Sequence, residues 1–268
     1  MIYEVKETIL YIEGVSLKYG DNLILRDINA HVKDIVGHGQ VVGLLGPSGI
    51  GKTQLFRILA GLQKPTTGMV SITDQKIPVT PGAVGVVAQN YPLLPHRTVI
   101  DNLMLVARKA KLSEKDGREK AMGYLERFKL ADKADFWPMR LSGGQRQRVA
   151  IAQQLISSEH FLLMDEPFSG LDPIMNDEVC ALISEVRDLH ELNTIIVITH
   201  DHRSAIKVAD TLWLMGRDRD ENNNVIPGAY IKYGYDLIER DLAWHTDISA
   251  TPQFTTFARE IKEKFKTL

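Results

Sequence analysis

The chain has 268 residues, a formal net charge of −2, 25% charged residues and a single cysteine, Cys180. This length is ample for a buried core and fits one large domain or two small ones. Because the charge is nearly balanced, we expect no nucleic-acid partner, and one cysteine excludes an internal disulfide or a cysteine zinc cluster.

Membrane-inserted segments are not expected either. No run of about 20 apolar residues could form a membrane-spanning helix. We also expect no secretory leader, because the first residues lack a basic start followed by an apolar stretch. A role at a membrane would therefore require another chain to supply the span.

The N-terminal segment predicts two antiparallel strands with one solvated face. Residues 8–20 mix β-branched and aromatic residues, Asp21-Asn22 favours a turn, and apolar residues alternate with polar ones over 24–32. Tyr19 ends the first strand. An aromatic residue there is usually an ordinary packing residue, but a nucleotide site also needs an apolar face on which to stack a purine.

A glycine-rich loop follows the apolar strand 41–45 and precedes a predicted helix over 55–61. The loop matches the pattern G-x-x-x-x-G-K-[ST] and comprises Gly46, Pro47, Ser48, Gly49, Ile50, Gly51, Lys52 and Thr53. Its glycines let backbone N–H groups turn inward around phosphate oxygens, and the helix N-terminus adds partial positive charge. Lys52 would then reach the β- and γ-phosphates, and the Thr53 hydroxyl would ligate Mg²⁺.

A helical insertion is predicted over 98–140, where the sequence becomes charged and favours helices. It follows further strands over 69–73 and 84–88, the second of which is followed directly by Gln89. Such a lone glutamine is usually a solvated side chain, and its interpretation depends on its neighbours.

The insertion ends in Leu141-Ser142-Gly143-Gly144-Gln145, and a helix is predicted over 146–156. Ser142 is a good N-cap residue, and the two glycines would let backbone N–H groups approach an anion. This string is a second candidate phosphate-binding device, although Ser-Gly-Gly by itself mostly forms a flexible turn.

Two adjacent carboxylates, Asp165 and Glu166, follow the buried strand predicted over 161–164. Charges there cost several kcal/mol unless something compensates them, and Mg²⁺ would do so. Asp165 fits an outer metal ligand. Glu166, expected to point the other way if the strand geometry continues, fits a base for an attacking water. Asp172 is predicted to cap the next helix.

Four polar or glycine positions come directly after apolar strands: Gly46, Gln89, Asp165 and His200. In an open parallel sheet all four lie along the carboxyl edge, where ligands bind. This convergence favours a functional role for His200, although a histidine near a strand end is more often a structural residue.

The last part of the chain is less informative. Residues 217–224 predict an exposed hairpin or loop, and 257–265 a short amphipathic helix. We therefore predict a domain over residues 1–216, with a helical subdomain over about 98–140, and a C-terminal appendage over 217–268 whose role is unknown.

Taken in this order, the segments resemble the nucleotide-binding domain of ATP-binding cassette (ABC) transporters over about residues 8–216. Tyr19 resembles the adenine-stacking aromatic residue of the family, residues 46–53 resemble its Walker A loop, and Gln89 resembles its Q-loop. Residues 141–145 resemble its LSGGQ motif, and residues 161–166 resemble its Walker B strand with the catalytic glutamate. Residues 169–172 resemble its D-loop, and His200 resembles its switch histidine. The resemblance implies an α/β P-loop NTPase fold: a mostly parallel core sheet, an N-terminal antiparallel β subdomain and an inserted α-helical subdomain.

The same resemblance implies an ATPase that uses ATP and Mg²⁺. The implied catalytic residues are Glu166, His200 and Gln89, and the implied metal ligands are Thr53, Gln89 and Asp165. Two copies, or two homologous subunits, would pair head to tail, so that residues Ser142, Gly143, Gly144 and Gln145 of one copy bind the nucleotide held by the Walker motifs of the other. ATP would close this dimer, and hydrolysis would let it reopen.

The segment 89–99 is similar to the corresponding segment of bacterial importer ATPases. The resemblance implies solute import through a separate transmembrane permease, from the cytoplasmic face of the inner (plasma) membrane. A periplasmic solute-binding protein is a further candidate partner. The transported solute is not indicated.

Two other classes of function share these motifs. A soluble ABC ATPase in DNA repair or translation usually carries a coiled-coil or zinc-bearing insertion or two cassettes, and none is visible here. A nucleotide-binding protein without catalysis would be expected to lack Glu166 or His200. Two departures from the family pattern have open consequences: Gln54 stands where many relatives have Ser or Thr, and Gln153 replaces a common arginine.

Overall fold

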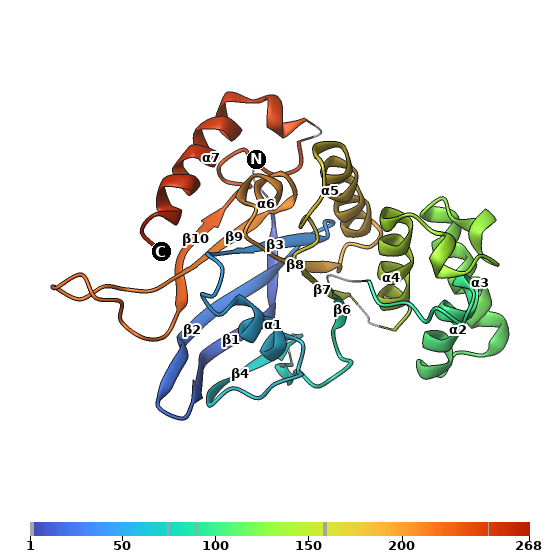
Figure 1. Cartoon of the computed structure of the whole chain (residues 1–268), viewed down its shortest axis with the longest axis horizontal. Helices are drawn as coiled ribbons and strands as arrows, with labels where there is room; N and C mark the ends of the chain where they lie inside the picture. The colour runs from blue at the N-terminus through green and yellow to red at the C-terminus, as the bar shows by residue number, and fades with distance from the viewer. Residues whose placement is uncertain (1–2, 74, 89–90, 158–159, 246) are drawn as a thin grey trace.

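The computed structural model describes residues 3–73, 75–88, 91–157, 160–245 and 247–268. These residues form two sheets, several helices packed on the larger sheet and a group of helices at one side (Figure 1). The fold is the α/β arrangement predicted from the sequence, with an antiparallel N-terminal sheet and a mostly parallel core sheet.

The N-terminal sheet has the strand order β2-β1-β4-β5, and all its pairs are antiparallel. The strands are β1 (Val5–Tyr19), β2 (Asn22–Ile35), β4 (Thr67–Ile72) and β5 (Ile77–Pro78). The predicted hairpin is confirmed, and its strands extend beyond the alternating segment because both continue to pair toward Val5 and Ile35.

The core sheet has the strand order β10-β9-β3-β8-β7-β6. Its strands are β3 (Gln40–Leu45), β6 (Gly85–Val87), β7 (Phe161–Asp165), β8 (Thr194–Thr199), β9 (Thr211–Gly216) and β10 (Tyr230–Asp236). The strands from β9 to β6 are parallel, and β10 is antiparallel to β9. Every residue of β3 and β8 is buried, as expected for parallel strands covered on both faces.

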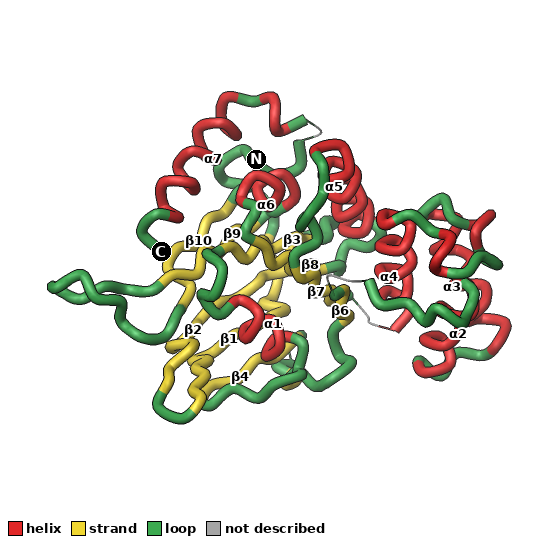
Figure 2. Tube along the Cα trace, in the orientation of Figure 1, coloured by secondary structure: helices red, strands yellow, loops and turns green. Residues whose placement is uncertain are grey.

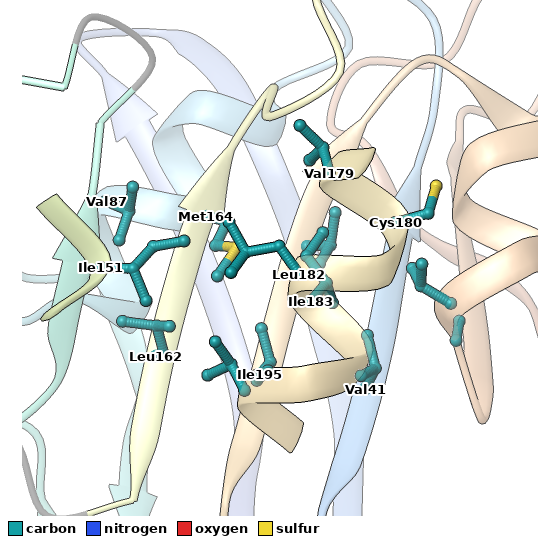
Figure 3. Close-up of a cluster of buried hydrophobic side chains, with 14 of the residues drawn as sticks. Val41, Val87, Ile151, Leu162, Met164, Val179, Cys180, Leu182, Ile183 and Ile195 are labelled. Atoms are coloured by element: carbon teal, nitrogen blue, oxygen red, sulfur yellow. The ribbon is translucent and has the colours of Figure 1, made fainter. Parts of the chain in front are cut away.

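Helices cover both faces of this sheet. Helix α1 (Lys52–Leu59) shares one hydrophobic cluster with the N-terminal sheet and with β3. On the other face lie α5 (Pro173–Asp188), α6 (His202–Val208) and α7 (Pro252–Phe265), which belong to a second cluster. Figure 3 shows part of this second cluster, where Leu182 and Ile183 of α5 pack toward Met164 of β7 and Ile195 of β8.

The predicted helical insertion is present as a separate group beside β6 (Figure 2). It contains α2 (Val99–Lys109), α3 (Glu114–Arg127) and two 3₁₀ turns, η1 (Ala131–Lys133) and η2 (Pro138–Arg140). Helix α4 (Gly143–Ser157) joins this group to the core sheet, because it packs against α2, α3 and β6.

Strand β10 (Tyr230–Asp236) and helix α7 (Pro252–Phe265) of the C-terminal segment are integrated into the core. Strand β10 pairs with β9, and α7 packs on α6, with Phe254 and Ile261 fully buried. A short turn, η3 (Ile248–Ala250), precedes α7, which begins five residues before the predicted amphipathic helix. The boundary proposed at 216/217 thus falls between two paired strands of one sheet. Among the described residues, none of the helices has the length and apolar character needed to cross a membrane.

Candidate active site

The glycine-rich loop connects the buried strand β3 to helix α1. Gly49 and Gly51 have φ values of 77° and 114°, a backbone region that side chains rarely adopt, which explains the glycines at these positions. Gly51 is the N-cap of α1, and no side chain caps this helix. The N–H groups of Lys52 and Thr53 are therefore available to an anion, where the helix dipole adds to the attraction, whereas Gln54 N donates to Gly51 O at 3.0 Å.

Lys52 lies inside this loop with only 7% of its surface exposed. Its Nζ donates hydrogen bonds to the backbone oxygens of Gly46, at 2.7 Å, and of Pro47, at 3.0 Å. Burial lowers the pKa of the ammonium group, and the nearby carboxylates of Glu166 and Asp165 oppose this shift. Among the described residues, the acceptors of this buried cation are backbone carbonyls, which phosphate oxygens would outcompete as charged acceptors.

The two carboxylates after β7 lie close to Lys52, but not as the strand alternation predicts. Strand β7 ends at Asp165, and Glu166 turns into the left-handed region with φ of 48°. The expectation that strand geometry continues through Glu166 is therefore wrong. The pKa of Asp165 is raised, first by burial and then by Glu166, whereas Lys52 lowers it.

Glu166 and His200 form a hydrogen-bonded pair across the ends of β7 and β8. His200 Nδ1 lies 2.9 Å from Glu166 Oε2, and the Thr199 hydroxyl donates to the same oxygen at 2.9 Å. The side chain of Glu166 is 20% exposed and that of His200 55% exposed. The Glu166 carboxylate is thus held in place by hydrogen bonds, whereas the His200 ring is open to solvent.

Asp165 is the residue best suited to a metal ion. Within the part of the chain that the structure describes, no hydrogen bond to its carboxylate is present, and the nearby Lys52 does not offset the burial that raises its pKa. The described residues contain no group of three His, Cys, Asp or Glu side chains that could hold a metal by themselves. This donor set fits Mg²⁺, which is usually held by one or two protein oxygens together with substrate phosphates. The exposed Thr53, in the first turn of α1, supplies a second oxygen.

Tyr19 ends β1 with 53% of its surface exposed. Its hydroxyl donates to Oε1 of Gln54, at 2.9 Å, and accepts from Nε2 of Gln63, at 2.8 Å. Gln54, which departs from the family pattern, thus has a hydrogen-bond partner in this structure. The sequence reasoning missed Gln63, since nothing in the sequence distinguishes this residue from other polar residues after α1.

The Leu-Ser-Gly-Gly-Gln segment lies at the start of α4, in the helical group. Gln145 N donates to Ser142 Oγ at 3.3 Å, and Ser142 N donates to Gln145 Oε1 at 3.0 Å. This reciprocal capping box explains why α4 begins at Gly143, three residues earlier than predicted. The glycines are therefore part of the first helical turn and not of a flexible loop.

The structure brings some of the predicted residues together and leaves others apart. Because β3, β8 and β7 are neighbours with Leu45 opposite Thr199 and Asp165 opposite Ile198, residues Gly46, Asp165 and His200 lie at adjacent strand ends. No hydrogen bond links residues 142–145 to the glycine-rich loop within the described ranges. Gln89 lies outside the described residues. Thr199 is a further contributor that the sequence reasoning missed, although it is the polar end of an apolar strand directly before His200.

The other departure, Gln153, is also accounted for by packing. Its side chain is 9% exposed and donates to the backbone oxygen of Asn102 at 3.1 Å, which ties α4 to α2. Asn102 in turn bonds Leu94, Arg97 and Thr98, and so organises the segment between β6 and α2. The amide side chain of Gln153 therefore has a neutral hydrogen-bond acceptor, the backbone oxygen of Asn102.

A phosphate-binding loop between a buried parallel strand and a helix, with carboxylates at the end of a nearby strand of the same sheet, defines a P-loop nucleotide-binding protein. Comparison with known proteins refines this class. Residues 29–169 match the family model described as ABC transporter.

Individual relatives agree with this match. The chain is 37% identical over 218 residues to the glutamine transport ATP-binding protein GlnQ of Geobacillus stearothermophilus, covering 78% of this chain and 88% of that protein. It is 35% identical over 229 residues to the sulfate/thiosulfate import ATP-binding protein CysA 2 of Shewanella oneidensis, covering 82% of this chain and 63% of that protein. A solved structure of cbiO1 from Clostridium perfringens, described as part of the ABC transporter complex cbiONQ, has a similar fold. Its TM-score is 0.74 at 24% identity, over 96% of this chain and 100% of that one.

The chain therefore belongs to the ABC transporter family, as an ATP-binding subunit with ATPase activity. The resemblance inferred from its motifs is confirmed.

Proposed function

We propose that this chain drives solute import by hydrolysing ATP at the carboxyl edge of its core sheet. The observation that carries the proposal is the Glu166–His200 pair, whose 2.9 Å contact lies at the strand end next to the one that leads into the Lys52 loop. The proposal is supported by the names of the relatives, which describe glutamine transport and sulfate or thiosulfate import.

Glu166 is the general base in this proposal. The side-chain contacts from Thr199 and His200 converge on Oε2, so Oε1 is the oxygen left to accept a proton from water. The water oxygen bonds the γ-phosphorus, the bond to the β–γ bridging oxygen breaks, and ADP leaves. The left-handed backbone at Glu166 is unfavourable for a glutamate, and strained positions of this kind are common at functional sites, which supports the proposal.

Lys52 and His200 act on the phosphates. The Lys52 ammonium, already stripped of most water, loses little solvation when phosphate oxygens replace the carbonyls of Gly46 and Pro47. His200 uses Nδ1 toward Glu166, which leaves Nε2 to contact the γ-phosphate. The loop residues Ser48, Gly49 and Gly51 supply backbone donors, and Tyr19 supplies a surface for the adenine ring.

Mg²⁺ would neutralise charge that develops on the phosphates during the reaction. Thr53 and Asp165 are the described residues that would hold it, and Gln89 is added on the family resemblance alone. The remaining motif, Ser142 to Gln145, is proposed to bind the nucleotide of a second copy or of a homologous subunit.

The partner that turns hydrolysis into transport is proposed to be a separate membrane permease. The chain would dock on it at the cytoplasmic face of the membrane, through the segment between β6 and α2 that Asn102 organises. A solute-binding protein on the other side of the membrane completes the proposed system.

Removing the base tests the chemistry directly. Glu166→Gln should keep ATP binding and lose most turnover, on the order of 10²- to 10⁴-fold, because the amide cannot take the proton. Phosphate release and ATP binding by the purified protein are the measurements, and Glu185→Gln, an exposed carboxylate on α5, is the matched control. Turnover of Glu166→Gln equal to that of the control would exclude Glu166 as the base.

A further inference from the structure

The Tyr19 hydroxyl lies between two glutamine side chains that come from two other segments. Gln54 is in the first turn of α1, and Gln63 is in the turn after that helix. We propose that Gln54 and Gln63 are positioning residues that hold the Tyr19 ring in place as the surface against which the nucleotide base stacks. This inference rests on the proposed function and deepens it.

The hydrogen-bond pattern fixes one orientation of the ring. A tyrosine hydroxyl has one hydrogen to donate, and here Gln54 Oε1 accepts it at 2.9 Å. Its lone pair accepts from Gln63 Nε2 at 2.8 Å. Because each bond polarises the next in the same direction, from Gln63 through Tyr19 to Gln54, the two bonds strengthen each other.

Such support matters because the ring is otherwise exposed at the end of a strand. A side chain that is 53% exposed samples several rotamers unless polar contacts hold it, and ordering it on binding would weaken affinity. Two hydrogen bonds order the ring before the nucleotide arrives. The affinity of the base for Tyr19 is then not reduced by that ordering step.

The position of Gln54 also couples the ring to the phosphate site. Gln54 follows Thr53 and Lys52 directly, so the same helical turn that carries the phosphate-binding residues holds the Tyr19 hydroxyl. The spacing between the stacking surface and the phosphate loop is thereby fixed by α1. A serine or threonine at position 54 is shorter than glutamine by two carbon–carbon bonds, which accounts for glutamine at this position.

The experiment separates binding of the base from binding of the phosphates. Affinities of the full chain for ATP and for inorganic tripolyphosphate are measured by calorimetry on wild type, Gln54→Leu, Gln63→Leu and Tyr19→Phe. Gln54→Leu and Gln63→Leu should each weaken ATP binding roughly 2- to 12-fold, the range for one lost hydrogen bond. Tyr19→Phe loses both bonds and should weaken ATP binding at least as much, and all three variants should leave tripolyphosphate binding unchanged. Gln253→Leu, an exposed glutamine at the start of α7, is the matched control and should change neither affinity.

The double variant tests whether the residues act through one another. Tyr19→Phe combined with Gln54→Leu should bind ATP no more weakly than Tyr19→Phe alone, because the phenylalanine already lacks the hydroxyl that Gln54 contacts. The melting temperatures of the variants without nucleotide should equal that of wild type, which separates a positioning role from a folding defect.

Four results would overturn the inference. Equal weakening of ATP and tripolyphosphate by Gln54→Leu would place Gln54 on the phosphates, and additive losses in the double variant would mean that the residues act independently. Unchanged or tighter ATP binding in Gln54→Leu would mean that the contact does not assist binding. If wild type bound no tripolyphosphate at all, the proposed phosphate loop would fail, and the inference with it.

Discussion

Asp210 is a buried carboxyl group that joins three strand ends. It is 1% exposed, and its Oδ2 accepts a hydrogen bond from Val41 N of β3 at 2.7 Å. Its backbone oxygen accepts from Leu237 N, just after β10, and Oδ1 has no hydrogen-bond partner among the described residues. Burial raises the pKa of Asp210 from 3.8 to about 7, against the opposing effects of Val41 N–H and Arg187.

This raised pKa predicts a stability that falls as pH rises. Between pH 3.8 and about 7 the folded protein holds a proton on Asp210 that the unfolded chain has lost, so the free energy of unfolding decreases across this window. Asp210→Asn keeps an acceptor for Val41 and has no charge to bury. Relative to wild type it should therefore gain stability between pH 5 and pH 8, on the order of 2–4 kcal/mol.

Urea unfolding of both proteins at several pH values measures this difference. Asp132→Asn, at an exposed aspartate of the helical group, is the control and should show little dependence on pH. A difference between wild type and Asp210→Asn that stays constant from pH 5 to pH 8 would contradict the titration of Asp210 in this range.

At the scale of residues, the sequence predicts which residues belong to the site better than it predicts which side chains they contact. Asp165 and His200 could be found because each lies where a buried strand ends, and Lys52 could be found because it belongs to the glycine-rich pattern that follows such a strand. The contact between Gln54 and Tyr19 could not be found, because a glutamine can bond many neighbours and the choice depends on how α1 packs under β1. The left-handed backbone of Glu166 was missed for a similar reason, since it is imposed by the turn after β7.

At the scale of elements, α5 and α6 are joined by a polar network that includes Asp201, the residue after His200. Asp201 caps α6 by accepting from the N–H groups of Arg203 and Ser204, at 3.0 and 3.2 Å. Asn176 of α5 donates to Asp201 at 3.4 Å, and the Ser204 hydroxyl lies 2.9 Å from Asn176 Oδ1. Although burial alone would raise the pKa of Asp201, the hydrogen bonds from Ser204, Arg203 and Asn176 lower it overall.

Breaking this network should affect turnover more than nucleotide binding. Asn176→Leu removes the polar link between the helix that follows Asp172 and the helix that follows His200. We expect kcat to fall roughly 2- to 30-fold, the range for a coupling of 0.5–2 kcal/mol, while the affinity for ATP stays within the error of wild type. Steady-state ATPase kinetics and calorimetric ATP binding are the measurements.

The neighbouring exposed residue provides the control for this prediction. Asp177→Asn removes only a surface ion pair with Lys207 and should change neither quantity noticeably. A parallel loss of ATP affinity and kcat in Asn176→Leu would show instead that the network shapes the nucleotide pocket as a whole.

The elements themselves were predicted well where their signals are local. The strands before Gly46, Asp165 and His200 are apolar runs, and such runs mark buried parallel strands. The place of β10 was not predictable, because it depends on contacts between distant residues. Arg26 pairs with Asp218 at 2.6 Å, and Leu25 bridges to Ala229, so the segment after β9 is held by the N-terminal sheet.

At the scale of the whole molecule, the two segments proposed to bind phosphates belong to different parts of the fold. The glycine-rich loop precedes α1, between the sheets, and Ser142 precedes α4, in the helical group (Figure 1). Two large apolar side chains are exposed beside the segments assigned to the dimer: Met139, at 82%, comes just before Ser142, and Ile174, at 74%, just after Asp172. A second copy that covers these segments would remove both side chains from water.

A mixed dimer tests whether each nucleotide lies between two copies. Lys52→Ala disables the phosphate loop of its own chain, and Ser142→Arg places bulk and positive charge at the start of α4. If the copies pair head to tail, a Lys52→Ala chain with a Ser142→Arg chain has both lesions in one site and none in the other. Such dimers should then hydrolyse ATP, up to about half the wild-type rate if the sites act independently, whereas neither homodimer should.

The measurement uses two affinity tags, so that only dimers containing both chains are assayed for phosphate release. ATP binding by the Ser142→Arg chain alone is the necessary companion, because its own phosphate loop is unchanged and should bind as in wild type. Loss of binding as complete as in Lys52→Ala would assign Ser142 to the pocket of its own chain. Since α4 and α1 lie in separate parts of the described fold, that result would require a large movement of the helical group, and the head-to-tail arrangement would have to be abandoned.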